Sequence, residues 1–202
     1  MLKLQASNGD LGSFASIGYN DMKKAQRVIS SIVQLLENKC TPVLDEKELQ
    51  YINFSVDGAK RLSALIDDML DYSRIGFDES KLDRVNLNTL VEEVIVLKKN
   101  LIDEKKAQLN VGDLPDISGI KTPIKSVFIN LISNALKYQE SGNVPMISIY
   151  SKTEGGFCQI TVEDNGIGID EAYFDKVFNV FSRLNGKNEY SGTGIGLAIC
   201  KR

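Results

Sequence analysis

The chain has 202 residues, of which 43% are hydrophobic and 25% are charged, and its formal net charge is -3. This size and composition exclude a disordered chain and fit one large or two small folded domains. The weakly acidic balance argues against nucleic acid or an acidic membrane surface as a partner, and no apolar run is long enough to span a bilayer.

Histidine is absent from the sequence, and the three cysteines, Cys40, Cys158 and Cys200, lie far apart. An odd number of isolated cysteines without histidine supports neither a zinc site nor a disulfide framework. The first residues also lack the pattern of a secretory signal peptide. We therefore expect a cytoplasmic chain with reduced thiols.

From Phe14 to Ile75 the sequence has helical periodicity alone, after a leader or connector over residues 1–12. Apolar residues recur there at spacings of three, four and seven in two runs. The first run is Phe14, Gly18, Ala25, Ile29, Ile32 and Leu36, and the second is Leu49, Ile52, Val56, Ala59, Leu62, Ile66 and Met69. Each run is typical of a helix that buries one side in a coiled coil or bundle.

The residues between the two runs predict a tight connection. Pro42 stops the first helix, and Asp45 can cap the second with Glu48 in the capping-box position. Gly76 offers a stop after the second helix. Residues 13–76 are therefore predicted to form an antiparallel helical hairpin. Because a lone hairpin cannot bury both of its apolar sides, we predict a homodimer with a four-helix bundle.

Residues 87–202 follow a predicted linker over 77–86 and alternate between helical and strand patterns. Helices are expected over 90–105, after Asn88, and over 124–138, with Thr122 as cap and Pro123 at the first helical position. Strand-like runs cover 146–152 and 157–164, joined by the turn sequence EGG. The fold class predicted for the whole chain is α+β in two domains, the second an α/β sandwich whose sheet is covered on one face by helices.

The first cluster with chemical potential is NLISNALKY, on the second helix of this domain. Asn130, Asn134 and Lys137 fall at i, i+4 and i+7 and hence on one helix face. Amide oxygens suit Mg²⁺, and the lysine supplies a point charge for a phosphate. An ordinary polar helix face explains this cluster equally well.

Two glycine-rich motifs follow. In EDNGIGI, Asp164 ends a strand, and Gly166 and Gly168 let the backbone approach a flat ligand, although glycines at a strand end more often only make a turn. In SGTGIGLAICKR, Gly192, Gly194 and Gly196 run into a helix whose free N–H groups could bind phosphate. No Gly-Lys-Ser/Thr follows, so this is not a Walker A loop, and no strand leads directly into it as a dinucleotide fold requires.

In this order and on these elements, the motifs resemble those of the histidine kinase family. NLISNALKY is similar to its N box, DNGIG and GTGIGL to its glycine boxes, and VFNVFSRL to the phenylalanine-rich box before the lid over ATP. The helical hairpin resembles the family's dimerisation and phosphoacceptor domain. The resemblance covers nearly the whole chain and implies an ATP-binding domain of the type shared with gyrase, Hsp90 and MutL.

The resemblance also implies roles for single residues toward ATP and Mg²⁺. Asn134 would hold Mg²⁺ with Asn130 nearby, and Lys137 would approach the phosphates. Tyr138 would lie against the adenine. Asp164 would accept a hydrogen bond from the adenine amino group. The remaining residues implied at the ATP site are Gly166, Gly168, Arg183, Gly192, Thr193, Gly194 and Gly196.

The first helix departs from the family where the phosphorylated histidine belongs. Family members have His, an acid, Leu, two variable residues and Pro-Leu-Arg; here Asn20 takes the acceptor position and Asp21 the general-base position. Ala25 replaces the proline, and Arg27 keeps the register. An amide nitrogen shares its lone pair with the carbonyl and is a poor nucleophile, unlike imidazole. Our hypothesis is that the chain binds Mg-ATP but cannot autophosphorylate on histidine.

Several interpretations stay open at this stage. The chain is the core of a sensor kinase whose acceptor was changed in nature or by engineering, or it is a non-catalytic dimeric pseudokinase that acts as a signalling scaffold. Another ATPase of the wider group, or a helical bundle with an inert α+β domain, is less consistent with the hairpin and the motifs. The family partner is the receiver domain of a response regulator, and a full-length protein would tether this core to a sensor or membrane domain.

The family's ATP domain continues past its last helix, so we expect the C-terminal end of the domain to be missing from this sequence.

Overall fold

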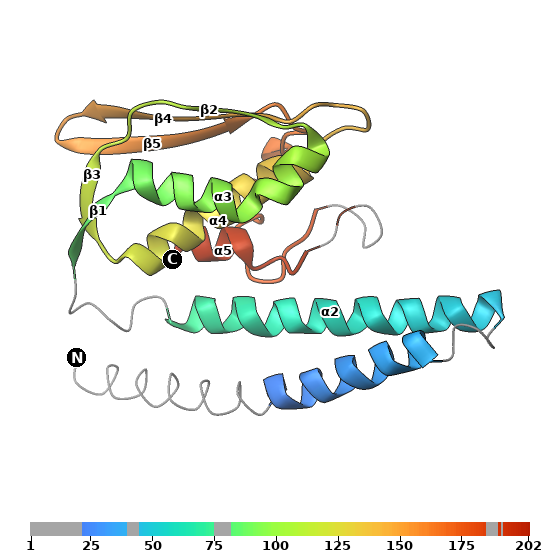
Figure 1. The fold of residues 1–202 in the computed structure, drawn as a ribbon. Helices are drawn as coiled ribbons and strands as arrows, with labels where there is room; N and C mark the ends of the chain where they lie inside the picture. Colours follow the sequence, from blue (N-terminus) through green and yellow to red (C-terminus); the bar gives the residue numbers. More distant parts are fainter. Residues whose placement is uncertain (1–21, 40–44, 75–81, 185–189, 191) are drawn as a thin grey trace, which may run out of the picture. The chain divides into compact units, whose positions relative to one another are not determined.

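The computed structural model describes residues 22–39, 45–74, 82–184, 190 and 192–202. The chain divides into two compact units, Met1–Phe77 and Asp78–Arg202, which are considered separately below (Figure 1). In the described ranges, none of the helices combines the length and the apolar character needed to cross a bilayer.

The first unit contains a helix over residues 22–39 and α2, Glu46–Arg74. The two helices run antiparallel, since the Gln26 amide donates to the Ala59 carbonyl at 3.1 Å and Lys23 pairs with Asp67. Gln26 is buried in this contact. Of the apolar residues predicted to form the seam of the first helix, Phe14 and Gly18 lie outside the described residues, and Ile29, Ile32 and Leu36 stay exposed within one chain.

The predicted capping box at the start of α2 is confirmed. The Asp45 N–H donates to the Glu48 carboxylate at 2.9 Å, and the Glu48 N–H donates to the Asp45 carboxylate at 2.8 Å. Each side chain thus satisfies a main-chain N–H that the helix leaves unpaired. The predicted stops at Pro42 and Gly76 lie outside the described residues.

The second unit is built on two small sheets. Strand β1, Asp83–Asn86, pairs antiparallel with β3, Asp116–Gly119. Strand β2, Gln108–Val111, pairs parallel with β4, Met146–Glu154, and β4 pairs antiparallel with β5, Phe157–Asp164. The predicted hairpin between β4 and β5 is confirmed, with Gly155 and Gly156 both at positive φ in its turn.

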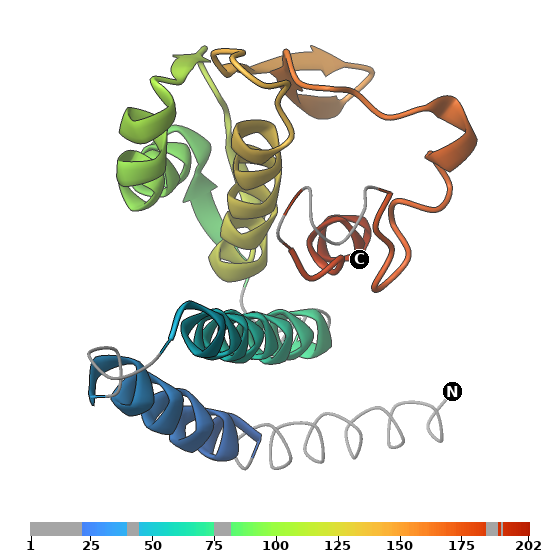
Figure 2. The same cartoon turned by 90° about the vertical axis from the view of Figure 1, so that its right-hand side faces the viewer.

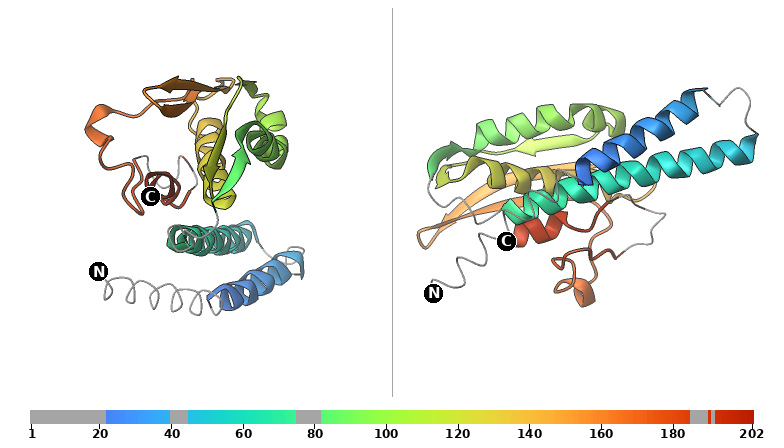
Figure 3. Two further views of the ribbon diagram at one scale, coloured as in Figure 1. Left: turned by 90° about the vertical axis from the view of Figure 1, so that its left-hand side faces the viewer. Right: turned by 90° about the horizontal axis from the view of Figure 1, so that it is seen from below.

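The two long helices of this unit, α3 (Leu87–Lys105) and α4 (Lys121–Lys137), cover one face of the three-stranded sheet, as predicted (Figures 2 and 3). The short helices η1, Glu171–Tyr173, and α5, Gly196–Lys201, follow, and α5 packs beside α4. The core between the helices and the sheet is apolar. Its most buried members are Leu87, Leu90, Val91, Val94, Ile132, Leu136, Ile147 and Ile149.

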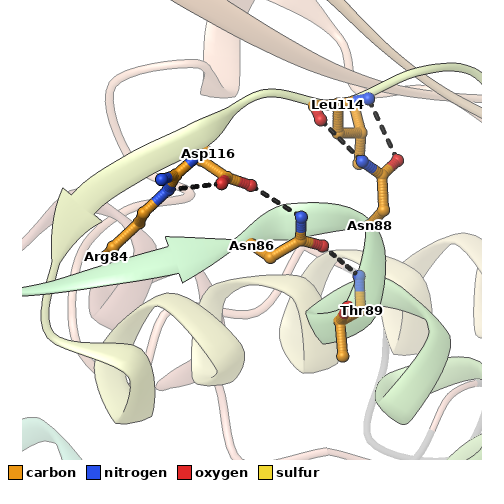
Figure 4. A network of polar contacts seen from close by, with 6 residues as sticks. All are labelled: Arg84, Asn86, Asn88, Thr89, Leu114 and Asp116. Carbon is orange, nitrogen blue, oxygen red and sulfur yellow. Dashed lines mark hydrogen bonds and ion pairs between the residues drawn. The ribbon is translucent and has the colours of Figure 1, made fainter.

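The start of α3 differs from the prediction. Asn86, not Asn88, is the cap, because its side-chain oxygen accepts from the Thr89 N–H at 2.8 Å (Figure 4). The Asn88 side chain instead donates to the Leu114 carbonyl at 2.6 Å and accepts from the Leu114 N–H at 3.0 Å. The observed cap precedes the predicted one because strand β1 runs directly into the helix. This strand lies inside the segment that was predicted to be a linker.

The start of α4 also differs from the prediction. The helix begins at Lys121 after Ile120, which makes no side-chain cap, so Thr122 lies inside the first turn and does not cap it. Pro123 is tolerated there because the first N–H groups of a helix have no partner within the helix. Lys121 and Lys125 hold this end against α3 through Glu93, at 2.7 and 2.6 Å.

Candidate functional site

The C-terminal end of α4 presents a cation next to an aromatic ring. The Lys137 ammonium donates to the Tyr138 hydroxyl at 2.6 Å and lies 4.0 Å from the centroid of its ring. A cation at that distance from a ring centroid is attracted by the negative face of the ring. The two motif residues that precede them, Asn130 and Asn134, are half-buried on the same helix.

The loop after β5 packs on this helix end through main-chain atoms. Asp164 is the last residue of β5, and its carboxylate accepts from the Gly166 N–H at 2.8 Å. The Ile167 N–H donates to the Tyr138 carbonyl at 3.1 Å. A Cβ at position 166 would stand only 2.2 Å from that carbonyl oxygen, so only glycine fits. The contact places the Asp164 carboxylate beside the backbone of Tyr138.

The glycine segment 192–196 reaches the same helix. A Cβ on Gly192 would lie 2.8 Å from the Lys137 ammonium nitrogen, and one on Gly196 would lie 2.7 Å from the Asn130 side-chain oxygen. Thr193 turns its hydroxyl back onto the segment, where it accepts from the Ile195 N–H at 3.3 Å. The third motif therefore runs alongside the polar face of α4.

The helix that follows this segment is α5, Gly196–Lys201. The first turn of α5 carries no charged side chain. The positive charge next to the segment comes from Lys137 instead. The Cys200 thiol on α5 is inert at neutral pH, because burial raises its pKa to about 11.

Tyr190 joins the site although none of the sequence motifs included it. Its ring centroid lies 5.0 Å from that of Tyr138, with the rings tilted by 51°, and its hydroxyl donates to the Gln139 carbonyl at 3.1 Å. Arg183, predicted to contact phosphate, donates from Nη2 to the Tyr190 carbonyl. An aromatic residue two positions before the glycine segment was the available signal in the sequence.

The structure thus brings together residues from three separated motifs. Along the C-terminal half of α4 lie Asn130, Lys137, Tyr138, Asp164, Gly166, Gly192 and Gly196. Gly168 has a positive φ in the loop after β5, and Gly194 has one next to Ser182. Asn20 and Asp21 lie outside the described residues. Within the part of the chain that the structure describes, no group of three or more Asp, Glu, Cys or His side chains could hold a metal ion.

Comparisons with known proteins show which proteins the chain is similar to. Residues 119–202 match the family described as "Histidine kinase-, DNA gyrase B-, and HSP90-like ATPase". Over 199 residues the chain is 36% identical to phytochrome-like protein Cph1 of Synechocystis sp., covering 98% of this chain and 26% of that protein. Over 211 residues it is 28% identical to the circadian input-output histidine kinase CikA of Synechococcus elongatus, covering 98% of this chain and 27% of that protein.

The chain belongs to the sensor histidine kinase family. It spans about a quarter of the length of the curated relatives named above. The solved structure of full-length histidine kinase ShkA in complex with AMPPNP has the same fold, with a TM-score of 0.67 at 21% identity over 94% of this chain and 40% of that one. The catalytic domain of histidine kinase ThkA has a TM-score of 0.51 at 29% identity, over 60% of this chain and 78% of that one.

Proposed function

We propose that the chain is the catalytic core of a two-component sensor histidine kinase and binds Mg-ATP at the end of α4. The family reaction is autophosphorylation of a histidine followed by transfer to an aspartate of a response regulator. In this chain the acceptor position carries Asn20, so the nucleotide site is kept while the acceptor is lost.

One observation carries the proposal: a cation and an aromatic ring from one motif and a carboxylate from a distant motif lie at one helix end. Lys137 lies between Tyr138 and the backbone of Gly192, and Asp164 lies beside the Tyr138 backbone. A nucleotide needs a cation for its phosphates, a flat surface for its base and an acceptor for an exocyclic amino group. The three side chains supply these features.

The residues present also fit a nucleotide along the rest of the segment. The backbone of Gly192 lies next to Lys137, and that of Gly196 lies next to Asn130. Main-chain N–H groups of Gly192, Thr193, Gly194 and Gly196 would donate to phosphate oxygens there. Lys137 would bind the phosphates, Tyr138 would pack on the adenine, and Asp164 would accept from its amino group. Gly166 and Gly168 would leave room for the base, and Arg183 would add a second cation near the phosphates.

Magnesium fits this site as a companion of the nucleotide. Mg²⁺ usually keeps several waters and binds through phosphate oxygens and one or two protein oxygens. Asn130 and Asn134 offer amide oxygens on the helix face next to the glycine segment. When bound, the metal would neutralise phosphate charge, and Asn134 would be its protein ligand. The metal would therefore arrive with ATP.

A calorimetric titration of the whole chain with ATP and Mg²⁺ tests the site. We expect saturable binding that weakens about 10- to 100-fold in Asp164→Asn, because a hydrogen bond to a charged acceptor is lost. Asp113→Asn makes the same change of charge in an exposed loop of the same unit and should bind like the wild type.

Removing Mg²⁺ with a chelator should weaken ATP binding to the wild type and leave ATP binding to Asn134→Ala little changed. A wild-type chain that binds no ATP contradicts the proposal.

The proposed loss of the acceptor follows from the chemistry of Asn20. No histidine exists elsewhere in the chain to replace it, and Asp21 would have no imidazole to activate. Acid-labile phosphate on the wild-type chain after incubation with γ-labelled ATP would disprove this loss.

A second candidate function is a non-catalytic dimeric scaffold that changes conformation when it binds ATP or a partner. The observation that favours it is the set of changes at the acceptor helix, where Ala25 and Gln26 stand in place of the family's proline and leucine. Mixing the chain with a histidine-bearing relative separates the two. Labelling of the relative by this chain's ATP site supports the kinase, and its absence despite ATP binding supports the scaffold.

The partners follow from the same proposal. Exposed apolar side chains on both helices of the first unit support a homodimer through a four-helix bundle, which light scattering in solution would show as twice the mass of one chain. The receiver domain of a response regulator would be the second partner; the solved complex of ThkA with the response regulator protein TrrA shows such a pairing for that kinase. We place the core in the cytoplasm, where ATP and receiver domains are found.

A further inference from the structure

Tyr190 makes two contacts that the family motifs do not account for. Its ring packs on Tyr138 with centroids 5.0 Å apart and a tilt of 51°, a geometry in the favourable range for aromatic pairs. Its hydroxyl donates to the Gln139 carbonyl at 3.1 Å. Tyr190 is 51 residues beyond Gln139 in the sequence, so the contact joins two distant segments of the unit.

The acceptor of this hydrogen bond is itself held firmly. The Gln139 side chain is buried, donates to the Ala135 carbonyl at 2.6 Å and accepts from Asn143 at 2.7 Å. The Asn143 amide also donates to the Asn165 carbonyl at 3.0 Å, in the loop that follows Asp164. A bond to Gln139 therefore fixes Tyr190 against a network that includes the backbone beside Asp164.

The Tyr138 ring is consequently restrained by two partners. The Lys137 ammonium holds its hydroxyl, and the Tyr190 ring packs against its ring. Arg183 binds the Tyr190 carbonyl and so adds a restraint on the main chain at this position. An aromatic ring that is held in one orientation loses less conformational entropy when a flat ligand packs on it.

We propose that Tyr190 is a positioning residue of the nucleotide site, which holds the Tyr138 ring in the orientation that receives the base. The proposal rests on the proposed function and adds to it the residue that orders the base end of the site. It differs from a general anchoring role, because it concerns the base and not the phosphates. A ligand without a base should therefore be insensitive to Tyr190.

Calorimetry on the whole chain tests this difference with two ligands, Mg-ATP and magnesium tripolyphosphate. We expect Tyr190→Ala to weaken ATP binding about two- to tenfold and to leave tripolyphosphate binding unchanged. Tyr190→Phe, which keeps the ring and loses the bond to Gln139, should fall between Tyr190→Ala and the wild type. Tyr150→Ala, at an exposed position of strand β4, is the matched control and should bind both ligands normally.

Two outcomes overturn the inference. One is ATP affinity in Tyr190→Ala equal to that of the wild type. The other is an equal loss for ATP and tripolyphosphate, which would make Tyr190 an anchor of the glycine segment only. A wild type that binds no ATP is a different result, because it removes the proposed function and this inference with it.

The chain contains no tryptophan, so a single one can serve as a reporter. In Tyr190→Trp, Mg-ATP should change the emission over the same concentration range as the calorimetric binding. Phe157→Trp, at an exposed position in the same unit, should show no change. An emission of Tyr190→Trp that stays constant while ATP binds would place residue 190 away from the base and contradict the inference.

Discussion

Glu93 links α3 to α4 through Lys121 and Lys125. The hydrogen bonds from the two lysines lower the pKa of the Glu93 carboxyl to about 2, against an ordinary value of 4.5. Since the folded pKa is the lower one, the carboxylate favours the folded state above pH 4.5. That contribution is lost as the pH falls toward 2.

We therefore expect Glu93→Gln to melt at a lower temperature than the wild type at pH 7. The gap should shrink between pH 4.5 and pH 2, because the wild-type carboxyl is then protonated as well. Circular dichroism melting curves across this range measure it. Glu92→Gln removes a charge one position along the helix and serves as the control. A gap that stays constant down to pH 2 would mean that the ion pairs do not cause it.

At the residue scale, the order of the motifs predicted which elements carry several of the candidate site residues. Asp164 at a strand end and Lys137 on a polar helix face were both placed correctly. Tyr190 was missed, since no spacing rule relates it to Tyr138, 52 positions earlier. Only folding shows that the two rings meet.

At the scale of single elements, a helix start was predicted correctly where neighbouring residues determine it, and wrongly where a distant segment does. The capping box of Asp45 and Glu48 is a local pattern and was predicted correctly. The cap of α3 was misplaced by two residues, because both Asn86 and Asn88 are good caps. The pairing of β1 with β3 decided between them, through Asp116, which binds both Arg84 and Asn86 (Figure 4).

Asn86→Ala should lower the free energy of unfolding of the second unit by about 1–2 kcal/mol, because it removes the cap of α3. Urea unfolding of the whole chain measures this change. Thr122→Ala, at the position wrongly predicted to cap α4, is the matched control and should cost little. A cost for Thr122→Ala as large as that for Asn86→Ala would refute the assignment of the caps.

The strands differ in how far the sequence revealed them. β4 and β5 have nine and eight residues with enough apolar positions to be recognised. β1, β2 and β3 have four residues each, too few for an alternation to stand out. These three strands form by pairing with segments that are distant in the sequence, and a local sequence pattern does not reveal such pairing.

For the whole molecule, the two units raise different questions. The second unit buries its apolar residues between two helices and a sheet. The first unit leaves large apolar side chains exposed, including Ile32 at 52% and Phe54 at 68%, which one chain alone does not cover. The helical periodicity predicted both helices. It did not show that Ile29, Ile32 and Leu36 stay exposed within one chain while the buried Gln26 contacts α2.

The central claim joins the two units: a nucleotide site is retained in a chain whose acceptor position holds Asn20. Incubation with γ-labelled ATP tests it most directly, using the wild type, Asn20→His and the double variant Asn20→His with Asp164→Asn. We expect acid-labile phosphate on Asn20→His, none on the wild type, and a strong loss in the double variant. Acid-labile phosphate on the wild type, or equal labelling of the two variants, would contradict the account.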